Sequence, residues 1–355
     1  MATSAPNVYR CTPRQARQFV LETMQAGLVP FLQSSPGMGK SSIIRSIVAQ
    51  LLAKLIDHRV STSAPEDFTG LPEFYTDAQG ERRARFVPFG DLFPLESDPI
   101  PDGKNGWVLF LDEFNHGTKL VQSAAYKLVL DRMVGQHRLH PNLAIAMAGN
   151  LSTDRAMTND LSTAMQSRVI HFEMQISHLE WLEDVAFREN YDERIVAYLN
   201  WQDKNLMDFR PEHNEKTFCC PRTWEFMNNH LKVNPNIDDN STSKFAGTIT
   251  SGVAVEFVQF CRVYKELVTL REILNSPTTA SLPRDPESRW AIVAHLIDKT
   301  DEKNFGDVST YINRLDLSFR VLYFRGLLVK QPKLRSHQSF ATAMAEVSKY
   351  LNKKS

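Results

Sequence analysis

The chain has 355 residues, with 41 basic and 41 acidic side chains, a formal net charge of +0 and 42% hydrophobic residues. At roughly 150 residues per domain, this length predicts two domains, or one large domain with a satellite. The balanced charge argues against a protein that coats nucleic acid or anionic membranes non-specifically, because such proteins carry a large basic excess. A local basic patch is still compatible with this composition.

The longest continuous apolar run, residues 107–111, has the length of a buried strand and is far shorter than the roughly 18–20 residues of a membrane span. The first ten residues are polar and contain no apolar segment of the kind that directs export. These features predict a cytoplasmic protein that does not cross a membrane. Cysteine usage agrees with this, since no C-x-x-C spacing occurs and all four thiols are expected to be reduced: Cys11, Cys219, Cys220 and Cys261.

The first part of the chain alternates between helical periodicity and short apolar runs. A helix is expected over residues 12–26, a strand over 28–32, a loop rich in Ser, Gly and Pro, and a second helix over 40–57. Apolar runs without a two-residue alternation, interleaved with helices, predict a three-layer α/β domain with a parallel sheet. The further elements expected here are a strand over residues 59–63, a long Pro-containing segment over 64–105, a strand over 107–111, a helix over 119–133 and a strand over 143–148.

After residue 174 the pattern becomes helical, and polar loops separate the helices. The segment 234–250 is rich in Asn, Asp and Ser, which predicts a mobile loop. The chain is therefore expected to consist of an α/β domain over residues 1–175 and a helical domain over residues 176–355. The helices expected in the second domain cover residues 179–187, 193–199, 224–233, 253–274, 289–297 and 308–328.

Residues 34–41 fit the phosphate-loop pattern G-x-x-x-x-G-K-[ST] at every position but the first, where Ser34 replaces glycine. Between a strand and a helix, the backbone N–H groups of such a loop surround β- and γ-phosphates, and the helix N-terminus adds positive charge. Lys40 would supply a point charge, and Ser41 a hydroxyl for Mg²⁺. A chance match at a strand-to-helix turn is the alternative. The candidate nucleotide-binding residues are Ser35, Pro36, Gly37, Met38, Gly39, Lys40, Ser41 and Ser42.

Two further candidate sites follow buried strands. Mg²⁺ needs oxygen ligands opposite the phosphates, which suits Asp112 together with Ser41, and an attacking water needs a base, which suits Glu113. Asn150, after the strand over 143–148, carries an amide that could orient that water. The alternatives are a strand end with solvated acids and an asparagine that serves the turn after Gly149.

These blocks resemble the MoxR branch of the AAA+ ATPases over about residues 12–231. The resemblance implies an AAA+ P-loop domain, followed by an all-helical lid and a C-terminal helical extension. Residues 65–72 and 85–92 also look like the family, and residues 133–140 resemble its short hairpin ahead of sensor 1. The matching blocks are residues 35–41 (Walker A), 109–115 (Walker B), 148–150 (sensor 1), 161–168 (the arginine-finger region) and 220–225 (sensor 2).

The resemblance assigns roles to two arginines. It implies that Arg168 acts on the nucleotide of a neighbouring subunit, where a guanidinium accelerates hydrolysis by about 10³–10⁵. Arg155 is the substitute for that role. Arg222 is expected to contact the γ-phosphate from the lid and to convert nucleotide state into domain rotation. A surface salt bridge is the alternative for each arginine.

The function that the resemblance implies is Mg²⁺-dependent ATP hydrolysis by a homo-oligomeric ring, with a hexamer as the expected form, coupled to remodelling or chaperone-like activation of a protein client. A von Willebrand A domain protein is the inferred client, because family members often act beside one. A nucleic-acid motor or loader and a nucleotide-gated scaffold are the rivals. Glu113, Asn150 and Arg168 argue against the scaffold, and the zero net charge argues against the motor.

Two basic segments are candidates for contact with a substrate. Residues 82–86 combine three arginines with an aromatic ring, which could stack on bases or grip a peptide. A solvated loop, partly neutralised by Glu81, is the preferred interpretation. Residues 319–331 carry Arg320, Arg325 and Lys330 and are expected to form a packed helix rather than a nucleic-acid face.

Overall fold

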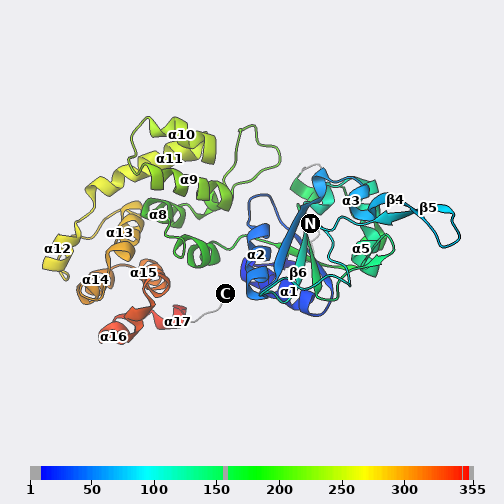
Figure 1. Cartoon of the computed structure of the whole chain (residues 1–355). Coiled ribbons are helices and arrows are strands. Elements are labelled where there is room, and N and C mark those ends of the chain that lie inside the picture. Colours follow the sequence, from blue (N-terminus) through cyan, green and yellow to red (C-terminus); the bar gives the residue numbers. More distant parts are fainter. Residues whose placement is uncertain (1–8, 155–158, 346, 352–355) are drawn as a thin grey trace, which may run out of the picture. The chain divides into compact units, whose positions relative to one another are not determined.

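The computed structural model describes residues 9–154, 159–345 and 347–351. The chain divides into two compact units, and the boundary lies between Ile176 and Ser177. The first unit contains all the sheets, whereas the second is built from helices (Figure 1). Among the residues described, no helix combines the length and the apolar composition that crossing a bilayer requires.

The first unit is built around a six-stranded sheet with the order β1-β10-β2-β9-β6-β3, in which every neighbouring pair is parallel. Parallel strands need crossover connections, and helices in those connections cover the two faces. The expected three-layer α/β fold with a parallel sheet, followed by a helical part, is therefore confirmed. The strands of this sheet are β1 (Arg10–Cys11), β2 (Val29–Gln33), β3 (Lys54–Arg59), β6 (Trp107–Asp112), β9 (Leu143–Gly149) and β10 (Val169–Met174).

Helices cover both faces of the sheet, and neighbouring residues of β6 point to opposite faces. Phe110 packs in one apolar cluster with residues of the two N-terminal helices, and Leu109 packs in a second cluster with residues of the later helices. The first helix begins at a capping box in which Thr12 and Gln15 satisfy each other's backbone N–H groups. The helices of this unit are α1 (Pro13–Gln25), α2 (Lys40–Gln50), α3 (Glu66–Thr69), α4 (Lys119–Ala124), α5 (Tyr126–Asp131) and α6 (Thr163–Gln166).

The second helix is shorter than expected, because α2 ends at Gln50 and the chain then turns into β3. Leu52 makes this turn with a left-handed φ of 51°. The leucines of residues 51–55 have helical spacing. All six residues of β3 nevertheless pair with β6, and this pairing stabilises the strand over the helix. The expected helix over 40–57 is wrong beyond Gln50. The expected strand over 59–63 is wrong too, since Val60–Thr62 forms a 3₁₀ turn.

Two antiparallel hairpins extend from the first unit. β4 (Leu71–Thr76) pairs with β5 (Arg82–Val87), and β7 (Met133–Val134) pairs with β8 (His137–Arg138) at the expected position of the short hairpin. Every residue of β4 and β5 is exposed, so these strands lack the alternation of buried and exposed residues that reveals a strand in a sequence. The preferred interpretation of residues 82–86 as a loop is therefore wrong.

The second unit packs its helices around a cluster of aromatic side chains. Trp224 and Phe257 are fully buried, and the rings of Tyr198 and Trp224 lie 5.7 Å apart. The helices are α7 (His178–Trp181), α8 (Glu193–Trp201), α9 (Pro221–Val233), α10 (Ser241–Ile249), α11 (Ser251–Arg262), α12 (Leu270–Asn275), α13 (Pro286–Lys299), α14 (Phe305–Ile312), α15 (Leu317–Lys330), α16 (Phe340–Met344) and α17 (Ser348–Leu351).

Three expectations for the second unit need correction. The segment 234–250 is not simply a loop, because α10 forms there and buries Phe245 and Ile249, whose apolar side chains outweigh the polar composition around them. The helix expected over 253–274 is interrupted between α11 and α12, and the one expected over 308–328 is interrupted between α14 and α15. The expectation that residues 319–331 form a packed helix is met by α15, in which Arg325 bonds to Glu183.

Candidate active site

Three of the segments singled out in the sequence meet at one edge of the sheet. The phosphate loop follows β2, Asp112 ends β6, and Asn150 follows β9. These three strands are neighbours in the order β2-β9-β6, and because they are parallel their carboxyl ends lie at the same edge. In open parallel α/β sheets, ligands bind at this edge.

The phosphate loop leaves backbone N–H groups available for an anion. Gly37 and Gly39 adopt left-handed φ values of 78° and 88°, which residues with a side chain rarely adopt. Gly39 is also the N-cap of α2 and brings no side-chain cap, so the first N–H groups of the helix have no partner from a cap. Ser34 is buried and is absent from the residues with positive φ, so its position does not require glycine.

The ammonium of Lys40 joins the phosphate loop to Asn150. Its Nζ donates to the Ser34 carbonyl at 2.9 Å and to Asn150 Oδ1 at 2.9 Å. Longer bonds reach the Ser34 hydroxyl at 3.1 Å and the Ser35 carbonyl at 3.4 Å. Lys40 and Asn150, which are 110 residues apart in the sequence, are therefore in direct contact.

Ser41 and Asp112 provide the oxygen atoms that a magnesium ion would need. The Ser41 hydroxyl, in the first turn of α2, donates to Asp112 Oδ2 at 2.9 Å. A hydroxyl and a carboxylate beside a phosphate loop form a hard donor set that fits Mg²⁺. Of the other predicted loop residues, Met38 packs against the apolar cluster below α2, and Ser42 is exposed.

Glu113 lies beside this pair in a strained backbone conformation. Its φ of 54° is left-handed, which is uncommon for a residue other than glycine and is often found at functional sites. The carboxylate accepts a short hydrogen bond from the hydroxyl of Ser61, and the Glu113 N–H donates to Asp112 Oδ1 at 2.9 Å. Ser61 therefore sets the position of the candidate base from the turn that follows β3.

Asn150 is held by its backbone as well as by its side chain. The Asn150 N–H donates to Asn115 Oδ1 at 3.1 Å, and Asn115 Nδ2 donates back to the Asn150 carbonyl at 2.8 Å. The Asn150 side-chain amide lies 3.4 Å from His116 Nε2. The loop that carries Glu113 and the end of β9 are thus joined by three hydrogen bonds.

Asp154 connects the segment after Asn150 to the phosphate loop. The Ser35 hydroxyl donates to Asp154 Oδ1 at 3.1 Å, and only 9% of Asp154 is exposed. Burial raises the pKa of the Asp154 carboxyl, while the bond from Ser35 and the charge of Lys40 act in the opposite direction. Asp154 therefore places a buried acidic group next to the residues that are predicted to hold phosphates.

Arg168 lies in the first unit away from this cluster, whereas Arg222 belongs to the second unit. Arg168 is exposed, donates to the Ala164 carbonyl at 2.7 Å, and stacks over Tyr126 with 5.1 Å between guanidinium and ring centre. It precedes β10, so it lies at the edge of the sheet opposite the phosphate loop, roughly 15 Å away along the strands. Arg222 is an exposed residue in the first turn of α9 in the second unit. Arg155 lies outside the described residues.

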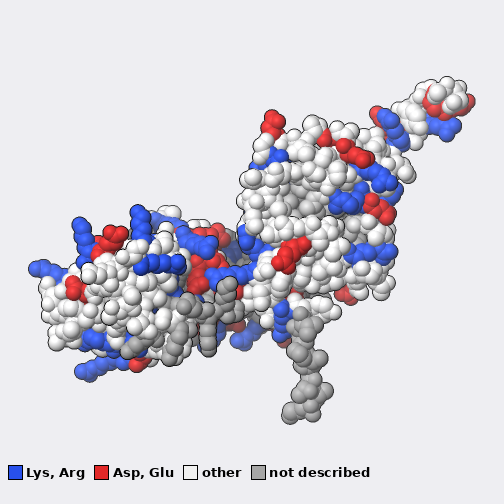
Figure 2. All heavy atoms as spheres, turned by 90° about the horizontal axis from the view of Figure 1, so that it is seen from below, with Lys and Arg blue, Asp and Glu red and all other residues white. Residues whose placement is uncertain are grey.

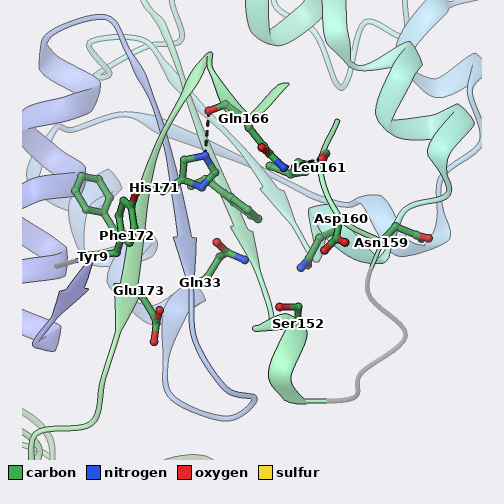
Figure 3. Close-up of a pocket in the computed structure, with 12 residues that line it drawn as sticks. Tyr9, Gln33, Ser152, Asn159, Asp160, Leu161, Gln166, His171, Phe172 and Glu173 are labelled. Carbon is green, nitrogen blue, oxygen red and sulfur yellow. Dashed lines mark hydrogen bonds between the residues drawn. The ribbon is translucent and has the colours of Figure 1, made fainter. Parts of the chain in front are cut away.

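A cavity of about 360 Å³ lies beside the end of β9 and is lined by Gln33, Asn115, Ser152 and Glu173, among others. In Figure 3, Gln33 and Ser152 point toward the open space beside β10, whereas His171 turns toward the carbonyl of Gln166, 3.0 Å away. None of residues 34–42, Asp112 or Glu113 lines it, so it is separate from the phosphate site.

Sequence reasoning did not assign roles to Ser61, Asn115 and Asp154. Asn115 lies in the segment of residues 109–115 and Asp154 follows Asn150 closely, but their partners lie 35 and 119 residues away along the chain. Ser61 bonds to a residue 52 positions away. The conformations of the loops that follow the strands bring such distant residues together, so no local pattern in the sequence marks them.

Comparisons with known proteins complete the description of this site. No family model matches the chain, and no curated protein matches it. Among solved structures, the RuvB Holliday junction branch migration motor of Thermotoga maritima is similar at 17% identity and a TM-score of 0.36, over 85% of this chain and 86% of that one. NtrX from Brucella abortus is similar at 13% identity and a TM-score of 0.38, over 95% of this chain and 67% of that one. The functional conclusion therefore rests on the geometry of the site itself.

Proposed function

We propose that this chain is a Mg²⁺-dependent ATPase of the AAA+ type, similar to the MoxR branch, which forms a ring and remodels a protein client. The observation that supports it most is the convergence of the phosphate loop, Asp112, Glu113 and Asn150 at the carboxyl ends of three neighbouring strands. Residues 1–175 would bind the nucleotide and residues 176–355 would form the lid. Arg222 would contact the γ-phosphate from the lid, so that the nucleotide state sets the rotation of the lid.

Each residue of the cluster has a chemical role in this proposal. The N–H groups of residues 35–42 and the Lys40 ammonium bind the β- and γ-phosphates. Ser41 and Asp112 hold Mg²⁺, which neutralises phosphate charge when it is bound. Glu113 takes a proton from the attacking water, and the Asn150 amide orients that water. The hydrogen bond from the Ser61 hydroxyl occupies one carboxylate oxygen of Glu113 and leaves the other available to take the proton.

The position of Arg168 supports a role at the nucleotide of a neighbouring subunit. The residue lies at the opposite edge of the sheet from its own phosphate loop, so it cannot reach a nucleotide bound there. In a closed ring, one surface of each subunit meets a different surface of the next, which brings such distant edges together. This arrangement is the reason for proposing a homo-oligomer, with a hexamer as the expected form.

Arg168→Ala is expected to lower hydrolysis by about 10³-fold or more while each subunit still binds ATP. Mixing Arg168→Ala with Glu113→Gln should restore part of the activity, because the two defects then lie on opposite sides of one interface. Steady-state phosphate release of the mixture, compared with each variant alone, checks this. Arg188→Ala, which changes an exposed arginine of the second unit, serves as the control. A mixture no more active than its parts would contradict action in trans.

The hairpin of β4 and β5 favours a protein client over nucleic acid. Two of its arginines are neutralised on the hairpin itself, since Arg83 pairs with Asp77 at 2.5 Å and Arg85 with Glu73 at 2.7 Å. In Figure 2, basic and acidic side chains are mixed on the hairpin that projects at the upper right. Large apolar side chains are exposed beside them, including Phe74 at 65%. A surface of this mixed character fits a polypeptide better than a phosphate backbone.

Replacing Arg82, Arg83 and Arg85 with Ala should leave basal hydrolysis unchanged and impair action on a protein client. A von Willebrand A domain protein is the first client to test.

Nucleic acid should not stimulate the ATPase at about 150 mM salt. A site with several phosphate contacts would instead bind nucleic acid at low salt, and its affinity would fall by roughly 10³-fold or more between 50 and 200 mM. ATPase assays with single- and double-stranded nucleic acid check this. Strong stimulation that disappears in the triple variant would favour the nucleic-acid motor instead.

A further inference from the structure

Asn115 holds the backbone of Asn150 through a reciprocal pair of hydrogen bonds. Its amide oxygen accepts from the Asn150 N–H at 3.1 Å, and its amide nitrogen donates to the Asn150 carbonyl at 2.8 Å. Only 4% of Asn115 is exposed, so these bonds are shielded from competing water. Among neutral side chains of this size, only an amide offers one donor and one acceptor in this geometry.

The contact between Asn115 and the end of β9 leaves no space for a side chain at position 149. A Cβ atom built on Gly149 would lie 2.4 Å from Asn115 Oδ1. The φ of Gly149 is not positive, so its backbone conformation would accept alanine. Glycine is therefore required at this position by the close approach of the Asn115 amide and the Phe31 ring, and not by the conformation of the chain.

Asn115 also contacts the segment that leads to Arg168. Its carbonyl accepts from the Asn159 N–H at 2.6 Å, and the Asn159 side chain donates to the Gly117 carbonyl at 3.0 Å. Residues 159–161 run directly into α6, whose N-cap is Ser162 and which ends just before Arg168. Asn115 thus contacts both the end of β9 and the start of the segment that leads to Arg168, and it also lines the cavity beside β9.

We propose that Asn115 is a positioning residue for ATP hydrolysis: its amide fixes the backbone of Asn150, so that the Asn150 side chain is aimed at the phosphate site, and its carbonyl links this strand end to the segment that carries Arg168. The inference rests on the proposed function. Asn150 Oδ1 lies 2.9 Å from Lys40 Nζ, so a shift of its backbone moves the amide away from the γ-phosphate. A displacement of about 1 Å in a catalytic group costs as much as 10²-fold in rate.

Asn115→Asp separates this role from a merely structural one. Aspartate has nearly the same shape as asparagine, so the substitution changes the hydrogen bonds and leaves the packing nearly the same. An ionised carboxylate only accepts hydrogen bonds, so it loses the bond to the Asn150 carbonyl and repels that oxygen. A protonated carboxyl donates and accepts, and so restores the pair. Burial raises the pKa of such a carboxyl, so its protonated form gains population as the pH is lowered. Asp160, His171 and Glu173 line the same cavity as Asn115, and Glu113 and His116 flank it in the sequence. All five are present in the wild type as well, so the ratio of variant to wild-type rate isolates the new carboxyl.

The experiment compares kcat and KM for Mg²⁺ATP between the wild type and Asn115→Asp from pH 6 to pH 8.5. At the upper end kcat should fall by about 10- to 100-fold while KM changes by less than about 3-fold, since the phosphate loop is intact. The ratio of variant to wild-type kcat should rise by at least about 5-fold toward pH 6. Asn142→Asp changes an exposed asparagine at the other end of β9 and should show neither effect.

Gly149→Ala provides a second variant that does not alter Asn115 itself. Its methyl group would displace the Asn115 amide, so kcat should fall at every pH while ATP binding is retained. Unchanged kcat in both variants, or a loss in Asn115→Asp that is equal at all pH values, would overturn the positioning role. Absence of hydrolysis by the wild type would instead overturn the proposed function, and this inference with it.

Discussion

Lys40→Ala is expected to abolish measurable ATP binding. The Lys40 ammonium is the main side-chain charge at the phosphate loop, and four oxygen atoms of the loop and Asn150 already surround it within 3.4 Å. One hydrogen bond to a charged group contributes about 1.5–3 kcal/mol of binding free energy. A lysine that bonds to two phosphates makes more than one such bond, so its total contribution is larger. Affinity should therefore fall by at least about 10²-fold. Isothermal titration calorimetry with ATP measures this loss.

The control for this variant is Lys54→Ala, because Lys54 is exposed at the amino end of β3, away from the phosphate loop. It should bind ATP as the wild type does. Circular dichroism shows whether each variant is folded. Unchanged binding by a folded Lys40→Ala protein would contradict the assignment of residues 35–42 to the nucleotide.

Glu113→Gln should bind ATP as the wild type does and lose most of its turnover. Glutamine keeps the shape of the side chain and its bond from Ser61, but it cannot take a proton from water. General base catalysis contributes about 10²–10⁴-fold, so steady-state phosphate release should fall by that factor while calorimetry gives an unchanged affinity. The variant should hold ATP long enough to retain a protein client in an affinity pull-down.

Glu96→Gln is a matched control for this substitution, because Glu96 is an exposed glutamate of the same unit. Its turnover should equal that of the wild type. If Glu113→Gln retained full turnover, the base would have to be another residue. A loss of both binding and turnover would instead assign Glu113 to nucleotide binding.

Most of the fold could be predicted from the apolar runs. The runs at residues 28–32, 107–111 and 143–148 became β2, β6 and β9, because a run buried on both faces must lie in the middle of a covered sheet. The failures occurred where pairing outweighs periodicity. The leucines of residues 51–55 continue the helical spacing, but residues 54–59 pair with β6, and residues 82–87 pair in a hairpin that is exposed on both faces. A composition rich in Asn and Asp concealed α10, whose few apolar residues are buried.

The part of the site that follows strand ends could also be predicted. Lys40, Asp112 and Asn150 come just after three apolar runs, and parallel strands bring such residues to one edge. Ser61, Asn115 and Asp154 could not be predicted in the same way, because their contacts depend on loop conformations and on the left-handed turn at Glu113. Arg168 was chosen by resemblance alone, and its place at the far edge of the sheet became clear only from the register of β10.

The measurement that tests the central claim most directly is phosphate release from ATP by the purified chain, with Mg²⁺ and with excess chelator. The proposal predicts steady release in Mg²⁺, none in chelator, and a loss of about 10²-fold or more when Glu113 is replaced by Gln. Release that persists in chelator, or that is the same in Glu113→Gln, would contradict the chemistry assigned to Ser41, Asp112 and Glu113. No release above background from the folded wild type would contradict the claim that this chain is an ATPase.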